Sequence, residues 1–149
     1  MYDINKLKQL RDETGISFSL CKKALEESKN DLELAKKLLN KWGIAKAKDK
    51  SDRRTESGII FSYVHHNGKI ASLIELACET DFVSGNKEFK SLGQELVMQA
   101  ASVRAETNDE FLSQEYIRDP SKKISDLIKE AILKFGENIK VNRFIRWNV

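Results

Sequence analysis

The 149-residue sequence has few of the residues from which metal and redox centres are built, with two cysteines and two histidines. Cys21 and Cys78 form no Cys-x-x-Cys pair, and His65 and His66 are adjacent, so neither a zinc site nor a redox pair is expected. Free cysteine is among the most often buried residues, and we interpret both thiols as small core side chains. A thiol–histidine nucleophile stays open at this point, because the sequence does not say which side chains are neighbours.

The sequence also lacks long apolar runs and phosphate-binding glycine motifs. No stretch approaches the roughly 20 apolar residues that cross a bilayer. The first residues lack the apolar segment of a signal peptide, so we expect a soluble intracellular protein with no membrane partner. The seven glycines form neither G-x-G-x-x-G nor G-x-x-x-x-G-K-S/T, and the chain is not expected to bind a nucleotide itself.

Charge is nearly balanced, with 26 basic and 23 acidic side chains and a net charge of +3. The excess is concentrated between Lys41 and Arg54, where six basic residues accompany two acidic ones. Such a run is a candidate contact for nucleic-acid phosphates. The small net charge and the scarcity of nearby aromatic residues favour a solvated tether instead, so we predict a linker here and no nucleic-acid partner.

Three short helices are predicted before this run, because apolar residues recur there at helical spacing. The residues placed to cap the helix beginnings are Asp3, Ser17 and Asp31. The expected ends are Gly15, the stretch 28–30 and Gly43. The apolar positions are Ile4, Leu7 and Leu10 in the first helix, Cys21, Ala24 and Leu25 in the second, and Leu32, Ala35, Leu38, Leu39 and Trp42 in the third. So small a bundle has a modest core, which suits a docking module on a longer chain.

After the run, the apolar period changes from that of a helix to that of a strand. Residues 58–65 and 69–78 are rich in β-formers and flank Asn67-Gly68, which predicts a tight hairpin. Two helices are expected next, one over 86–105 and one capped by Asp119, with Pro120 in its first position and its end at Gly136. A third strand over 139–149 is expected to place Ile139, Val141, Ile145, Trp147 and Val149 on one face.

The predicted fold is of the α+β class. It consists of a three-helix bundle over 1–43, a basic linker over 44–57, and a core over 58–149 in which helices pack on a small three-stranded antiparallel sheet.

Two features of the core are candidates for function. Glu75, Glu79 and Asp81 alternate in register and could share one edge of a strand, as paired acid and base carboxylates of a hydrolase would, although solvent-facing carboxylates of a hairpin give the same pattern. The segment that follows carries Phe82 and Val83 beside Asp81, where a polar turn is expected. Either Asp81 caps the next helix and Phe82 packs locally on it, or Phe82 is an aromatic wedge presented to a partner.

Three motifs in this order resemble translation elongation factor Ts. They are Leu10-Arg11-Asp12-Glu13-Thr14-Gly15 with Cys21-Lys22-Lys23-Ala24-Leu25, then Glu79-Thr80-Asp81-Phe82-Val83, which contains T-D-F-V, and Gly136-Glu137-Asn138-Ile139 followed by Arg143. The resemblance covers nearly the whole chain. It implies an N-terminal module of the ubiquitin-associated type, a linker and a core that grips the GTPase elongation factor Tu.

The resemblance implies a nucleotide exchange factor without covalent chemistry, cofactor or bound metal. Its partner is elongation factor Tu, both GDP-bound and nucleotide-free. The implied exchange loop, which displaces Mg²⁺ and loosens GDP, is Thr80, Asp81, Phe82 and Val83. The residues implied to contact the same GTPase domain are Lys8, Arg11, Phe18 and Ser19. The family often has two methionines where this chain has Phe18 and Ser19.

Many members of that family have a second core half and a coiled-coil insertion, and this chain stops soon after its third strand. The resemblance therefore implies a short form, for which we expect a homodimer that uses the apolar face of the last strand. The expected location is the bacterial cytoplasm or, for a mature organellar form, a matrix or stroma. A non-enzymatic adaptor that binds partners through the three-helix module is the alternative, but an adaptor has no need of an aromatic wedge.

Overall fold

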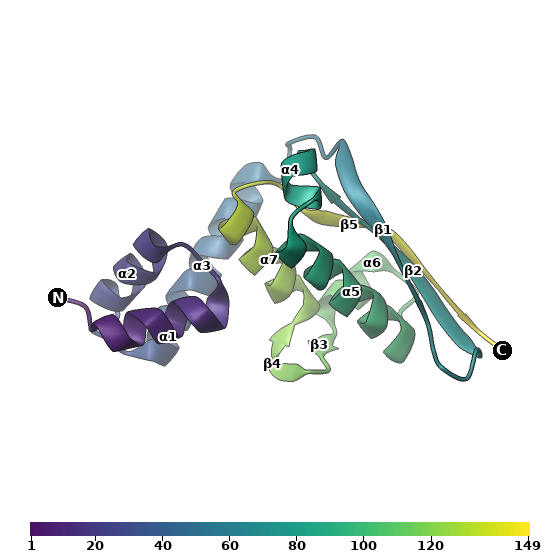
Figure 1. Ribbon diagram of the computed structural model, residues 1–149, viewed down its shortest axis with the longest axis horizontal. Coiled ribbons are helices and arrows are strands. Elements are labelled where there is room, and N and C mark those ends of the chain that lie inside the picture. Colours follow the sequence, from purple (N-terminus) through teal and green to yellow (C-terminus); the bar gives the residue numbers. More distant parts are fainter. The chain divides into compact units, whose positions relative to one another are not determined.

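Three helices form most of the first of two compact units in the computed structural model, which describes residues 1–149 (Figure 1). This unit contains residues 1–51 and 129–136. Its first helices are α1 (Ile4–Thr14), α2 (Phe18–Glu27) and α3 (Leu32–Lys50). The three predicted caps are confirmed, because the side chains of Asp3, Ser17 and Asp31 each accept a main-chain N–H of the following turn.

The core of this unit is the predicted apolar face of each helix. Its fully buried members include Leu7, Leu10, Cys21, Ala24, Leu25, Ala35 and Leu39, and Leu133 from a later helix joins them. Ile4 is an exception, because it lies at the first helical position and is 62 % exposed. Gly15 ends α1 as expected, with a φ of 65° that a residue with a side chain rarely adopts.

Gly43 does not end the third helix, contrary to the prediction. Its φ is not positive, and α3 continues to Lys50, so much of the basic run is helical. A Cβ at Gly43 would lie 3.1 Å from the carbonyl oxygen of Lys129. The glycine therefore allows two helices to approach each other closely. In the sequence, a glycine with this role looks the same as a glycine that ends a helix. The division of the chain at 1–43, 44–57 and 58–149 remains a prediction.

The second unit, residues 52–128 and 137–149, is built on the predicted three-stranded antiparallel sheet. Its strands are β1 (Ser57–Val64), β2 (Ile70–Cys78) and β5 (Lys140–Asn148), in the order β1-β2-β5. The Asn67-Gly68 hairpin is confirmed, with Gly68 at a φ of 69° and its N–H donating to the carbonyl of His65.

One face of the sheet is covered by α5 (Lys87–Ser102) (Figure 1). Phe61 of β1 contacts Phe89 of α5, with ring centroids 6.5 Å apart. Ser72 is buried and donates to the carbonyl of Val97 at 2.6 Å. A Cβ on Gly93 would collide with the Phe61 ring, so this glycine lets the helix lie close to the sheet.

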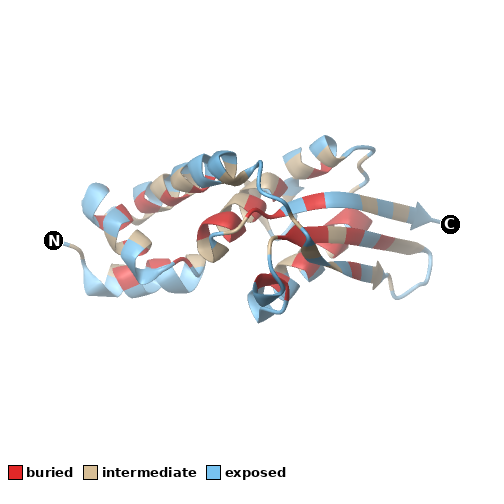
Figure 2. Cartoon of the chain, turned by 90° about the horizontal axis from the view of Figure 1, so that it is seen from above, coloured by how far each residue is buried: buried red, intermediate tan, exposed pale blue.

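The predicted apolar face of the last strand is only partly correct. The β2–β5 register shifts so that Leu76 faces Val141 while Glu75 faces Arg143, which leaves Asn142 as an extra residue in a bulge. A bulge reverses the alternation beyond it. Val141 is therefore buried, whereas Ile145 and Trp147 lie on the uncovered face, and Figure 2 shows burial of β5 confined to its beginning.

The segment before the last helix also differs from the prediction. Asp119 and Pro120 do not begin a helix, but belong to β4 (Asp119–Lys123), which pairs with β3 (Glu115–Tyr116). Proline is tolerated here because a two-stranded ribbon consists of edge strands. The helix α7 (Ile124–Phe135) follows, and it ends at Gly136, with a φ of 71°, as predicted. Two short helices, α4 (Asp81–Ser84) and α6 (Asn108–Ser113), were not predicted.

No helix is both long and apolar enough to span a membrane.

Candidate functional site

The segment that follows β2 forms a single helical turn with one large side chain in solvent. Val83 and Ser84 are buried, whereas the Phe82 side chain is 92 % exposed. Thr80 occupies the N-cap position of α4 without a side-chain capping bond. The interpretation of Asp81 as a cap and Phe82 as a local packing residue is therefore wrong, and the aromatic ring is presented to solvent.

Glu137 holds the main chain that leads into this turn. One carboxylate oxygen of Glu137 accepts the N–H groups of Glu79 and Thr80, at 3.1 and 3.0 Å. The other oxygen accepts the Thr80 hydroxyl at 2.6 Å. Hydrogen bonds to a charged group are about twice as strong as neutral ones, so this carboxylate fixes the start of α4 firmly.

A second carboxylate completes the arrangement in the opposite direction. Glu79 accepts the N–H of Asn138 at 2.6 Å and lies 3.5 Å from the guanidinium of Arg53. The buried Asn138 amide donates in turn to the carbonyl of Arg53 at 2.9 Å. These bonds, together with those of Glu137, tie three segments that are distant in sequence. We call Arg53, Glu79, Glu137 and Asn138 the clamp.

The far side of the turn is fixed to the first strand. The Ser57 hydroxyl donates to the Asp81 carboxylate at 2.6 Å and lies 3.2 Å from the Ser84 hydroxyl. The carboxylate of Asp81 remains exposed beside Phe82. The T-D-F-V segment thus has a fixed main chain, one bonded carboxylate, a buried valine and a free aromatic ring.

The three carboxylates weighed as acid and base have separate partners. Glu75 lies 3.7 Å from the guanidinium of Arg143 on the neighbouring strand, Glu79 belongs to the clamp, and Asp81 accepts from Ser57. No group of histidine, cysteine or carboxylate side chains is arranged to hold a metal ion. Nothing in this geometry supports the hydrolase alternative.

Both cysteines are buried, as predicted. The thiol of Cys78 lies beneath the clamp and donates to the carbonyl of Thr80 at 3.3 Å. Burial raises the pKa of Cys78, and the nearby Glu137 carboxylate raises it further. Burial likewise raises the pKa of Cys21. Both side chains are therefore protonated core residues rather than nucleophiles.

The other predicted contact residues lie in the first unit, on the outside of α1 and at the start of α2. Lys8 and Arg11 are exposed and one turn apart on α1. Phe18 and Ser19 directly follow the capping Ser17, and the Phe18 side chain is 49 % exposed. The ring of Tyr2 meets that of Phe18 edge to face, with centroids 6.5 Å apart. This second aromatic is therefore only partly covered.

Sequence reasoning did not identify the clamp. Glu137 and Asn138 belong to a motif that pointed to a family but carried no assigned role. A usable signal was present, because an antiparallel third strand beginning near residue 139 lies beside the end of β2, and Ala77 does face Lys140. That pairing brings Glu137 to Thr80. The contributions of Arg53 and Ser57 had no comparable signal.

The fold and site define a protein that acts through binding, with an anchored turn presenting an aromatic side chain. Comparison with known proteins gives the family. A family model described as Elongation factor TS matches residues 79–149. A relative named elongation factor Ts from Coprothermobacter proteolyticus is 38 % identical over 96 % of this chain and 95 % of its own length. Another of that name, from Thermosipho melanesiensis, is 38 % identical over 100 % and 99 %. The chain belongs to the elongation factor Ts family, whose members are non-catalytic nucleotide exchange factors for elongation factor Tu.

Relatives of two lengths match this chain. The elongation factor Ts of Aquifex aeolicus is 42 % identical over 95 % of this chain, but only 51 % of its own length is covered. The Coprothermobacter alignment runs over 188 positions, more than the 149 residues of this chain, so that relative also has residues that this chain lacks. The family therefore contains members of different lengths, some of them about twice as long as this chain.

Proposed function

We propose that Thr80, Asp81, Phe82 and Val83 form the exchange segment of this chain. In this proposal Phe82 enters the nucleotide-binding domain of elongation factor Tu, displaces Mg²⁺ and promotes the release of GDP. The observation that carries the proposal is the 92 % exposure of Phe82 on a turn whose main chain is fixed by Glu137. Removing such an apolar ring from water is favourable, and here a partner surface is needed to cover it.

The energetics of exchange fit an inserted side chain. An exchange factor weakens GDP binding because it binds the nucleotide-free partner more tightly than the GDP-bound one. A coupling free energy of ~4 kcal/mol between GDP and the exchange factor lowers the affinity of the partner for each of them about a thousandfold. Burial of Phe82 supplies ~1.5–3 kcal/mol of this coupling. Mg²⁺ is held by charge and oxygen ligands, so Asp81, an exposed carboxylate beside the ring, competes for polar contacts around the metal site.

We propose that Lys8, Arg11, Phe18 and Ser19 contact the same GTPase domain. The two cations are exposed on one side of α1, and Phe18 offers a half-exposed ring at the start of α2. Aromatic and arginine side chains are the commonest energetic anchors of protein interfaces. Since the relatives compared are bacterial proteins, we place this function in the bacterial cytoplasm.

We further propose a homodimer in which a second copy covers the open face of the sheet. Large apolar side chains from all three strands are exposed on that face: Ile60, Val64, Leu73, Ile145 and Trp147. Two sheets pack face to face about 10 Å apart, and a second copy supplies a matching apolar sheet. Light scattering is expected to show a dimer for the chain and a monomer for Trp147→Lys. A monomer at millimolar concentration of the unaltered chain would refute this proposal.

The release of a fluorescent GDP analogue from elongation factor Tu, followed by stopped flow, tests the exchange segment. Phe82→Ala is expected to slow stimulated release by about 10- to 100-fold, as the loss of buried apolar area implies. The free energy of unfolding of this variant is expected to change by less than about 0.5 kcal/mol, because the ring is exposed. The matched control is Ile117→Ala, which removes another exposed apolar side chain of the same unit. Unchanged release from Phe82→Ala would contradict the proposal.

A further inference from the structure

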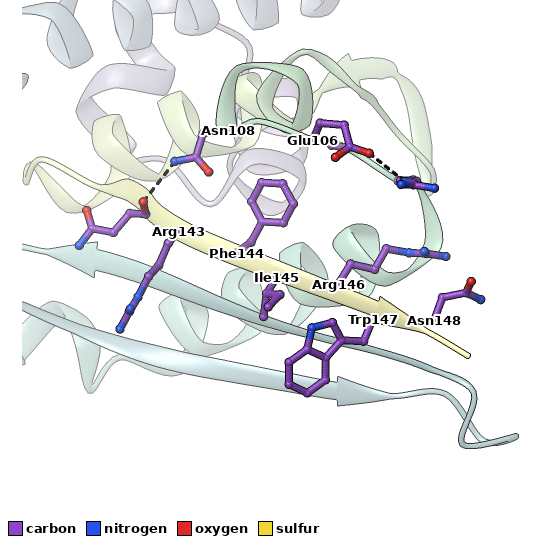
Figure 3. Close-up of a pocket in the computed structure, with 11 residues that line it drawn as sticks. Glu106, Asn108, Arg143, Phe144, Ile145, Arg146, Trp147 and Asn148 are labelled. Atoms are coloured by element: carbon purple, nitrogen blue, oxygen red, sulfur yellow. Dashed lines mark hydrogen bonds and ion pairs between the residues drawn. The ribbon is translucent and has the colours of Figure 1, made fainter.

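The outer edge of β5 lies open beside a groove that the exchange function does not use (Figure 3). The groove has a volume of about 620 Å³ and runs between β5 and the loop that contains Arg104 and Glu106. β5 is the last strand in the order β1-β2-β5, so one of its sides has no neighbouring strand. The groove therefore follows a strand edge.

The main-chain groups that face the groove follow from the strand pairing. The N–H of Val149 donates to the carbonyl of Lys69, so the main-chain N–H and C=O groups of Val149 point toward β2. In an antiparallel strand alternate residues direct their N–H and C=O groups to opposite sides. Phe144, Arg146 and Asn148 therefore direct theirs outward, into the groove.

The start of β5 is closed to a partner strand, and its end is open. The side-chain amide of Asn108 donates to the carbonyls of Val141 and Asn142, at 3.3 and 3.2 Å. Beyond the bulge at Asn142, the outward main-chain N–H and C=O groups of Phe144, Arg146 and Asn148 form no hydrogen bond. Such an edge is a template for the addition of another strand.

The charge of the groove selects the kind of strand. Arg143 and Arg146 lie on the strand, and Arg104 lies on the opposite wall, 2.9 Å from Glu106. Figure 3 shows Arg146 on the side of the helices and Arg143 on the other side of β5. Arg143 is paired on that other side with Glu75, at 3.7 Å. On the side of the helices, the Nε of Arg146 donates to the carbonyl of Ala101 at 2.9 Å, which holds the guanidinium in place. Arg104 and Arg146 are there accompanied by one acidic side chain, Glu106, so this part of the groove carries a net positive charge.

A second copy of β5 is disfavoured at this edge when the two strands pair symmetrically about Arg146. Antiparallel self-pairing centred on the outward-facing residues brings the two Arg146 side chains opposite each other, and like charges in that position are destabilising. We propose that the β5 edge binds an extended, acidic segment of a partner protein, which adds as a fourth strand with its carboxylates against Arg104 and Arg146.

The test uses a fluorescently labelled, capped nine-residue peptide in which glutamate alternates with valine and threonine. Its fluorescence anisotropy is expected to rise on titration with the full chain, and the affinity to fall as salt is added. The same peptide with lysine in place of glutamate is expected not to bind. Equal binding of the two peptides, or no binding of the acidic one at millimolar concentration, would overturn the proposal.

Two charge variants move the affinity in opposite directions. Arg104→Glu is expected to weaken binding about tenfold, and Glu106→Gln, which frees Arg104, to strengthen it about threefold. The matched control is Arg54→Glu, which makes the same charge change at an exposed arginine outside the groove. An equal loss in Arg54→Glu would show that only the overall charge of the chain is sensed.

A proline variant tests the strand pairing itself. Asn148→Pro removes an outward N–H that bonds to no strand, so the sheet is expected to retain its stability. Peptide binding is expected to fall about tenfold with the loss of that hydrogen bond to the added strand. In the unaltered chain, the peptide is expected to slow hydrogen exchange of the Arg146 and Asn148 amides. Full binding by Asn148→Pro, or displacement of the peptide by single-stranded RNA, would overturn the assignment to a peptide strand.

Discussion

The two sets of proposed contacts with elongation factor Tu are positioned by different kinds of interaction. On α1 and α2 the helix caps are local, because Asp3 accepts N–H groups two and three residues ahead and Ser17 accepts one three residues ahead. Asn30 adds longer-range bonds at the start of α1, to Met1, Asp3 and Lys6. The exchange segment instead depends on distant residues. Thr80 is held by Glu137, 57 residues later, and Asp81 by Ser57, 24 residues earlier.

This difference predicts which parts of the fold must form before each set of contacts is positioned. The capping bonds of α1 and α2 form whenever those helices form, and the bundle then orients their exposed side chains without any strand pairing. The exchange segment is fixed only when β1, β2 and the start of β5 are assembled. A side chain that is already fixed loses less conformational entropy when its partner binds, and Phe82 therefore gains most from the clamp.

Glu137→Ala is the change expected to have the largest effect. It leaves the N–H groups of Glu79 and Thr80 and the Thr80 hydroxyl without their acceptor. We expect a loss of about 2–3 kcal/mol in the free energy of unfolding, measured by urea denaturation. Stimulated GDP release is expected to fall at least as far as in Phe82→Ala, because the ring is no longer held in one orientation.

A double variant separates positioning from general destabilisation. If Glu137 acts through Phe82, the combination of Glu137→Ala and Phe82→Ala releases GDP no more slowly than the slower single variant, since changes in one network are not additive. Additive losses would show that the clamp affects exchange by another route. The conservative Glu137→Gln, which retains one acceptor oxygen, is expected to lie between Glu137→Ala and the unaltered chain.

Phe18→Ala tests the locally positioned set and is expected to have a smaller effect. The Phe18 side chain is already half-covered, in part by Tyr2. A partner can therefore bury less new surface than at Phe82, and we expect about a fivefold loss of affinity for elongation factor Tu, or ~1 kcal/mol. Isothermal titration calorimetry gives the value. A loss as large as that of Phe82→Ala would remove the distinction between the two sets.

The same contrast explains which parts of the molecule could be predicted from the sequence. The caps at Asp3, Ser17 and Asp31 and the Asn67-Gly68 turn are local signals, and all four are confirmed. The bulge at Asn142 is set by pairing with β2, so the reversal of Ile145 and Trp147 had no local signal.

The predictions of helix boundaries at Asp119-Pro120 and at Gly43 were wrong for a related reason. Both sites have the composition of a helix boundary. In the structure, however, β3 pairs with the strand that contains Asp119 and Pro120, and α7 approaches Gly43. In the site, the exposed Phe82 could be proposed from its unusual place in a turn. Glu137 could not, because its role exists only once two strands are side by side.

Asp3→Ala is expected to lower stability by about 1 kcal/mol, the usual contribution of a helix cap. The loss arises in the first turn of α1, before Lys8 and Arg11, so we expect GDP release to remain within about twofold of the unaltered chain. Urea denaturation and stopped flow measure the two quantities. A large loss of exchange would show that the first unit is not positioned locally.

The β3–β4 ribbon gives an intermediate case, because Tyr116 joins it to α5 across 21 residues. The Tyr116 hydroxyl donates to Glu95 at 2.7 Å, and burial together with this carboxylate raises its pKa to about 12. Tyrosine in an unfolded chain has a pKa of about 10. The raised pKa means that the protonated hydroxyl contributes stability below about pH 10, which is lost as the pH rises toward about 12.

The expected signature is a stability difference that closes with pH. At about pH 8 Tyr116→Phe is expected to be less stable than the unaltered chain by about 1 kcal/mol, the contribution of one hydrogen bond. Because the unfolded tyrosine ionises above about pH 10, the difference shrinks toward about pH 12. Urea denaturation of both proteins over this range cancels the titration of the lysines that they share. A difference that stays constant with pH would show that Glu95 does not hold the hydroxyl in solution, and that the ribbon is fixed mainly by the buried Gln99, whose amide donates to the carbonyl of Glu115.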